Sequence, residues 1–160
     1  MKAQALETAD IEVFSEAVTH FFETTCGEKA QVRTAFLLDA RAPLPWGDFN
    51  GIVEASGGYS GRICFSAPRS LLSHLLLRMG QADFSDEQHL DIVGEIANIF
   101  SGRARRHFGD RLCISPPRTF AGSAGAAALA ASAASSPPFA IPLCWNGYEA
   151  NLVVQLDALG

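Results

Sequence analysis

Hydrophobic residues recur at helical spacing in two short parts of the chain and in one longer part. Residues 11–22 place their large apolar side chains on one face and their glutamates mostly on the other, and Gly27 follows where a helix would end. Residues 68–79 begin with a proline, which suits the start of a helix, and continue with paired leucines before Gly80. The two shorter patterns therefore predict two helices.

The longest helical pattern begins at Ser85 and ends near Gly109. Ser85 is a favourable N-cap residue, and Gln88 stands where a capping box would place it. On a helical wheel one broad side is apolar and should be buried: Leu90, Ile92, Val93, Ile96, Ala97, Ile99, Phe100 and Ala104. The opposite side, expected to face solvent, carries Asp91, Gly94, Glu95, Asn98, Ser101, Gly102 and Arg105.

Short apolar runs separated by turn residues predict a sheet. Residues 50–66 form two such runs around a pair of adjacent glycines, which indicates a hairpin. Residues 139–156 form a second hairpin, because the Asn-Gly pair at 146–147 supplies the two positive-φ positions of a type I′ turn. Three further segments look extended: 31–38, 112–114 and 118–121.

These elements predict an α/β (α+β) fold with a mixed, largely antiparallel sheet of about six strands. The first and third helices should pack along one face of that sheet. A chain of 160 residues suits a single domain over residues 1–160. Residues 122–138 consist almost entirely of Ala, Ser, Gly and Pro, a composition that favours a surface loop.

Composition limits the classes of function that are open to the chain. It has 48% hydrophobic residues, and its 12 basic against 17 acidic residues leave a net charge of −5. A basic surface for nucleic acid is therefore not expected. No apolar stretch is long enough to cross a membrane and no secretory signal is visible, so we expect a cytoplasmic protein. The four cysteines are scattered and unpaired in sequence, and we expect them to be small buried residues.

The third predicted helix carries the strongest candidate for chemistry. Asp91, Glu95 and Asn98 follow one another at spacings of four and three and thus form one line, called here the polar stripe. A carboxylate can pair with a lysine of a partner protein, and an amide one turn away can position a water molecule. Such positioning supplies much of the catalysis in phosphoryl hydrolysis. The simpler alternative is that the stripe is only the solvated side of an amphipathic helix.

Other arrangements of reactive residues are weaker. Ser70, Ser73 and His74 lie on one short helix and lack the separate orienting group that a catalytic triad needs. His89 and Asp91 would point to different sides of their helix and cannot share a metal ion. This pair therefore gives no metal site.

The run Asp91-x3-Glu95-x2-Asn98, followed by Pro117, resembles the signature of the CheX, CheC and FliY phosphatases, which act on the phosphorylated response regulator CheY. The resemblance extends over nearly the whole chain, through GIVEASGGYSGRICFS, GEIANIFSGRAR, ISPPRTFAG and FAIPLCWNGYEANLVV. A single E-x-x-N pair is similar to the one-site CheX arrangement. The resemblance implies a CheC-like fold.

The resemblance also implies roles for individual residues. Glu95 would pair with the lysine of the regulator's active site, and Asn98 would orient the water that attacks the aspartyl phosphate. The partner-binding surface would comprise Asp91, Gly94, Gly102 and Arg105. The chain would bind no cofactor and carry no metal ligands of its own, because the Mg²⁺ for this chemistry would lie in the regulator. A homodimer is expected on the same basis.

Two functions remain open at this point. The first is a CheX-like phosphatase that hydrolyses the aspartyl phosphate of a CheY-type response regulator and ends chemotaxis or two-component signalling. The alternative is a non-catalytic CheX-like module that docks a response regulator or another signalling partner through the same helix. Arginines near the end of that helix serve either its dipole or an acidic regulator surface.

Overall fold

The computed structural model describes residues 3–4, 6–38, 46–122 and 136–159. Its three helices are those that the sequence predicts, with longer bounds for the first. They are α1 (Thr8–Cys26), α2 (Arg69–Arg78) and α3 (Asp86–Phe108). Gly27 ends α1 in the left-handed conformation, with φ of 73°. The helix periodicity and the glycine stop signal are thus confirmed.

Nine strands form one sheet, and every strand pair within the described residues is antiparallel. Six of them follow the order β2-β8-β9-β5-β4-β6, while β1 pairs with β9, β3 with β8 and β7 with β4. The strands are β1 (Ala3–Gln4), β2 (Gln31–Val32), β3 (Phe36–Leu37), β4 (Phe49–Gly57), β5 (Tyr59–Ala67), β6 (Leu112–Ile114), β7 (Arg118–Ala121), β8 (Phe139–Trp145) and β9 (Tyr148–Leu159). The predicted fold class is confirmed. Within the described residues, however, the sheet is antiparallel throughout and not mixed.

Both predicted hairpins are present. β4 and β5 pair from Phe49↔Ala67 to Ala55↔Gly61, and Gly57 takes the positive φ that their connection requires. β8 and β9 pair up to Trp145↔Tyr148. Their turn places Asn146 and Gly147 at φ of 54° and 82°, as a type I′ turn requires.

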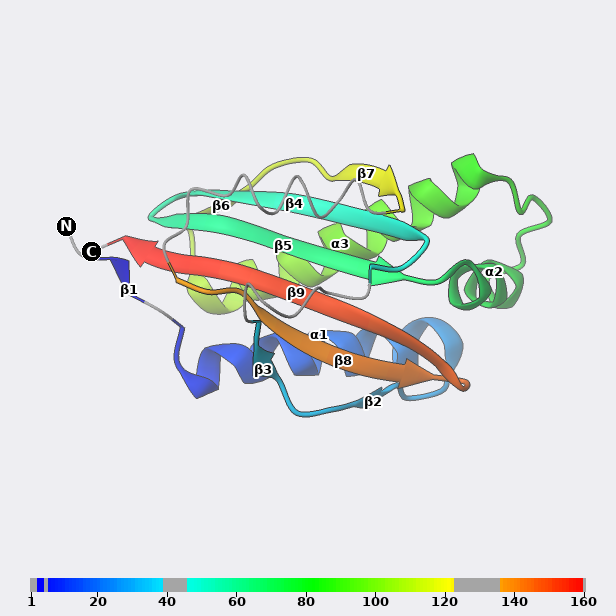
Figure 1. Ribbon diagram of the computed structural model, residues 1–160, viewed down its shortest axis with the longest axis horizontal. Helices are drawn as coiled ribbons and strands as arrows, with labels where there is room; N and C mark the ends of the chain where they lie inside the picture. Colours follow the sequence, from blue (N-terminus) through cyan, green and yellow to red (C-terminus); the bar gives the residue numbers. More distant parts are fainter. Residues whose placement is uncertain (1–2, 5, 39–45, 123–135, 160) are drawn as a thin grey trace.

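The helices lie on one side of the sheet, with α1 beside α3 and α2 at one end (Figure 1). Phe100 of α3 makes edge-to-face contacts with Phe21 of α1 at 5.8 Å and with Phe65 of β5 at 5.4 Å between ring centroids. Phe65 and Phe100 are fully buried, and burial of such a side chain contributes roughly 1.5–3 kcal/mol. Phe100 therefore fixes which side of α3 faces the core.

The two long helices run in opposite directions. Near one end, Nε2 of His107 in α3 lies 3.0 Å from the Asp10 carboxylate in α1. Near the other end of α1, Thr24 and Thr25 lie with Asn98, from the middle of α3, around one groove. The start of α1 is consequently beside the last turn of α3, and the end of α1 is beside the middle of α3.

Some expectations fall outside the described residues or need correction. Most of the loop at 122–138 lies outside them, because the structure describes only Gly122 and residues 136–138 of it. Cys64 is buried, and burial raises the pKa of its thiol to about 12. Cys113 is exposed on β6, and Cys26 and Cys144 are half-buried, so the prediction of four buried cysteines is confirmed for Cys64 alone. In the described part of the chain, no helix has the length and apolar character to cross a bilayer.

Candidate functional site

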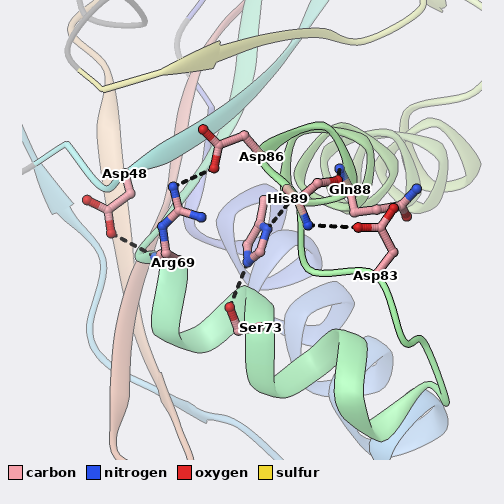
Figure 2. Close-up of polar contacts among 8 residues, drawn as sticks. Asp48, Arg69, Ser73, Asp83, Asp86, Gln88 and His89 are labelled. Carbon is pink, nitrogen blue, oxygen red and sulfur yellow. Dashed lines mark hydrogen bonds and ion pairs between the residues drawn. The ribbon is translucent and has the colours of Figure 1, made fainter.

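The start of α3 is held by a side-chain cap. The Ser85 hydroxyl accepts a hydrogen bond of 3.3 Å from the backbone N–H of Gln88, which confirms Ser85 as the N-cap. The backbone N–H of Ser85 donates to the Asp83 carboxylate at 3.0 Å (Figure 2). Asp83 thus fills the second half of the predicted capping box, in place of Gln88. This cap satisfies amide groups that a helix start otherwise leaves unpaired.

His89 is fully buried and joins α2 to α3, a role that our reading of the sequence missed. Its Nδ1 lies 2.7 Å from the carbonyl oxygen of Ser85, so Nδ1 carries the proton and donates. Nε2 then accepts from the Ser73 hydroxyl at 2.6 Å, as Figure 2 shows. The ring also stacks on Phe49 of β4 at 5.2 Å. One histidine therefore links two helices and the sheet.

A sequence signal for this role exists. His89 continues the apolar face of α3, since it precedes Ile92, Val93 and Ile96 by three, four and seven positions. Its partner Ser73 lies on another helix, and sequence spacing within one helix does not connect the two residues. His74, by contrast, is half-buried at the boundary and contacts the ring of Trp145 and the hydroxyl of Tyr148.

Removal of His89 should weaken the fold measurably. We expect His89→Ala to lower the free energy of unfolding by about 2–4 kcal/mol, because it leaves a cavity and removes the acceptor of the part-buried Ser73 hydroxyl. Ser73→Ala should cost about 1–2 kcal/mol, since it leaves Nε2 without a donor. Ser70→Ala, on the exposed side of the same helix, is the control and should change stability by less than about 0.5 kcal/mol. Urea titration measures all three, and equal effects of the two serine variants would contradict this role for His89.

The polar stripe is exposed. Asp91, Glu95 and Asn98 all face solvent, and none of the three side chains forms a hydrogen bond or ion pair with the described part of the chain. The residues between them point inward, with Ile92 and Ile96 among the buried core. An acid and an amide are thus held one turn apart on a helix whose other sides are packed. Their side chains are open to a macromolecular partner.

Gly94 does not share this exposure. It is buried, and a Cβ at this position would lie 2.8 Å from Cγ2 of Thr119 and 3.6 Å from Pro117. On β4, a Cβ at Gly51 would lie 2.5 Å from the carbonyl oxygen of Val93. The two glycines therefore allow α3 to approach β4 and β7 closely. Contact within the chain explains Gly94, so its predicted exposure is wrong.

Ser101 is also buried, against the sequence-based expectation, and its hydroxyl donates to the carbonyl oxygen of Ala97 at 2.7 Å. The solvent-facing side of α3 is narrower than a wheel predicts because β7 and β4 cover it from one side and α1 from the other. Arg105 is exposed at the end of α3, where its Nε donates to the carbonyl oxygen of Leu112 at 3.2 Å. Arg105 thus ties α3 to β6.

The surroundings of Gly102 differ from those of Gly94, although both glycines lie within α3. Gly102 is half-buried, and a Cβ there would meet no atom within 4 Å. Gly102 lies on a groove of about 470 Å³ between α1 and α3, whose other lining residues are His20, Phe21, Thr24, Thr25, Asn98, Ile99, Arg103 and Arg106. Asn98 therefore belongs both to the polar stripe and to this groove. Sequence reasoning could not place the α1 residues beside it.

Metal ligands do not gather in the part of the chain that the structure describes. No group of three or more His, Cys, Asp or Glu side chains there is arranged to hold a metal ion. The polar stripe itself offers only two carboxylates and an amide on one exposed helix face.

The chain belongs to the CheX family. The sequence model described as "Chemotaxis phosphatase CheX" matches residues 49–144, which is more than half of the chain and includes all of α3. Among curated proteins, no match to the chain is found.

Solved structures show the same fold. A CheC-like superfamily protein from Shewanella sp. PV-4 superposes with a TM-score of 0.78 at 18% identity, covering 94% of this chain and 99% of the other. CheX from Desulfovibrio desulfuricans superposes with a TM-score of 0.76 at 22% identity, covering 92% of this chain and 99% of the other. A chain of the CheX–CheY–BeF3–Mg²⁺ complex from Borrelia burgdorferi superposes with a TM-score of 0.72 at 18% identity, covering 91% of this chain and 96% of the other. The fold is therefore CheC-like.

Proposed function

We propose that this chain is a phosphatase that hydrolyses the aspartyl phosphate of a phosphorylated CheY-type response regulator and so ends its signal. The observation that carries the proposal is the exposure of Glu95 and Asn98, one turn apart on a packed helix and without partners in the described part of the chain. The family description names a chemotaxis phosphatase, and one structural neighbour is a CheX in complex with CheY.

The chemistry follows from the two side chains. Glu95 is an acceptor that pairs with the lysine of the regulator's active site, and Asp91 adds negative charge on the same side. The Asn98 amide cannot accept a proton as a base, but its oxygen and its N–H groups can hold a water molecule in line with phosphorus. The water oxygen forms a bond to phosphorus while the bond to the aspartyl oxygen breaks. Inorganic phosphate and a free carboxylate result, and the water proton leaves with phosphate or solvent.

In this proposal the metal belongs to the partner. The Borrelia complex contains CheY, BeF3 and Mg²⁺ together with CheX. For the present reaction, Mg²⁺ in the regulator would neutralise the charge that develops on the phosphoryl oxygens. This chain supplies the positioning groups on α3, which needs no cofactor of its own.

The direct test is phosphate release. Phosphorylated CheY-type regulators of the organism that encodes the chain are incubated with Mg²⁺, with and without the purified protein, and free phosphate is followed over time. Acceleration supports the phosphatase. Binding of a regulator without acceleration supports instead the non-catalytic docking module, and no acceleration with any regulator contradicts the enzyme. Sedimentation of the same sample tests the homodimer that we include in the proposal.

Charge reversal in the polar stripe should weaken the complex itself. We expect Glu95→Arg to raise the Kd for a beryllofluoride-activated regulator by at least about tenfold, because an arginine would face the regulator's lysine. Glu12→Arg is the control. Glu12 is exposed on α1, two positions from Asp10, which contacts the opposite end of α3. Titration calorimetry gives both constants, and an unchanged Kd for Glu95→Arg would remove Glu95 from the interface.

A further inference from the structure

The groove between α1 and α3 combines an apolar floor with a cationic rim. Phe21 and Ile99 supply apolar surface, and the polar lining includes two threonines of α1. His20, Arg103 and Arg106 supply every ionisable group among its lining residues, which include no carboxylate. This is unusual for a chain of net charge −5. The groove is therefore a local cationic surface on an acidic protein.

The two arginines are not used elsewhere in the described part of the chain. Neither Arg103 nor Arg106 forms an ion pair there, whereas the neighbouring Arg105 donates to Leu112 and His107 contacts Asp10. Basic residues near the C-terminal end of a helix interact favourably with the helix dipole. This interaction explains the presence of the arginines but not the apolar floor of the groove beside them. An adjoining hollow contains Glu16 and Glu23 together with Arg103. The Arg106 end of the groove is thus the more strongly cationic.

The groove is also continuous with the proposed reaction site. Asn98 lies on its lining, so anything seated in the groove lies beside the amide that would position water. Gly102 keeps the middle of the groove open, because a side chain there would project into space that is otherwise empty. A glycine in the interior of a helix costs about 0.5–1 kcal/mol relative to alanine. The need for an open groove would explain why a glycine stands here despite its cost to helix stability.

We infer that this groove receives an acidic segment of the response regulator, with an apolar side chain over Phe21 and Ile99 and carboxylates against Arg103 and Arg106. Opposite charge selects such a segment over the rest of a protein surface. Seated there, the segment sets the regulator's orientation so that its phosphoryl group meets Asn98. The inference rests on the proposed function, since it names the part of the same partner that α1 and α3 hold.

The test reverses the charge of the groove and measures binding separately from turnover. For Arg103→Glu/Arg106→Glu, the Kd for beryllofluoride-activated regulators should rise by about tenfold or more at low salt, and the salt dependence of binding should become smaller. Arg33→Glu is the matched control. Arg33 is exposed next to β2, beside Glu149, and should leave the Kd within about twofold. Circular dichroism checks that both variants fold.

The outcomes separate this inference from the phosphatase proposal. Weaker binding by the groove variant, with Asn98→Ala still binding, supports the groove. If the groove variant binds and accelerates phosphate release like the unaltered chain, the groove inference is wrong and the phosphatase stands. If the unaltered chain binds without accelerating release, the phosphatase fails, and the groove is still judged by the Kd. A change in sedimentation of the groove variant would show a self-interface and overturn the inference, as would failure of the unaltered chain to bind any regulator.

Discussion

Replacement of Asn98 with alanine is expected to remove the acceleration of phosphate release while the chain still folds and still binds its regulator. Asn98 is exposed and makes no hydrogen bond to the described part of the chain, so its loss leaves no buried group unpaired. Loss of one positioning group for a transition state typically lowers kcat by about 10²- to 10³-fold. Alanine is also a good helix former, so α3 should persist.

Single-turnover assays of phosphate release and calorimetric binding should be run side by side for this variant. A fall in rate with a Kd within about threefold is the pattern of a group that acts mainly in the transition state. Gln81→Ala removes an amide of similar chemistry from the exposed connection between α2 and α3 and should change neither value. A fully active Asn98→Ala protein would show that another group orients the water.

Alanine at Gly51 is expected to destabilise the chain strongly, whereas alanine at Gly102 should stabilise it. The new Cβ at position 51 would lie 2.5 Å from the Val93 carbonyl oxygen, and this backbone atom can move only if α3 moves away from β4. Such overpacking costs about 1–3 kcal/mol. At position 102 the new Cβ meets no atom within 4 Å, so helix propensity contributes up to about 1 kcal/mol of stability.

Denaturant titration of both variants checks this contrast, because each substitution adds only one methyl group. Phosphate release is a second measurement. Because Gly51→Ala should displace α3, it should reduce activity even at denaturant concentrations below its unfolding midpoint, where the variant is still folded. Gly102→Ala leaves α3 in place but adds a methyl group to the middle of the groove, so it should fold stably and weaken regulator binding. A Gly51→Ala protein as stable as the unaltered chain would mean that α3 does not press on β4 as described.

Local sequence patterns could predict the helices, both hairpins and the exposure of Glu95 and Asn98. Each of these depends on neighbours within a few positions, where backbone geometry determines which side chains share a face. The same reasoning failed for Gly94 and Ser101, which it placed toward solvent. A wheel assumes one buried side, but α3 is covered by the sheet and by α1. Burial from two directions is a property of packing, and helix periodicity does not contain it.

His89 also shows which features the sequence determines and which depend on tertiary packing. Its place on the apolar face was visible in the sequence, while its hydrogen bond to Ser73 required two helices to meet. The groove likewise needs α1 and α3 to run antiparallel, which brings His20 beside Asn98 and Arg106. Sequence alone therefore determined the local elements and an acid and an amide on one helix face. The tertiary structure decided which glycine is packed, which is open and what lies beside Asn98, because those contacts join residues that are distant along the chain.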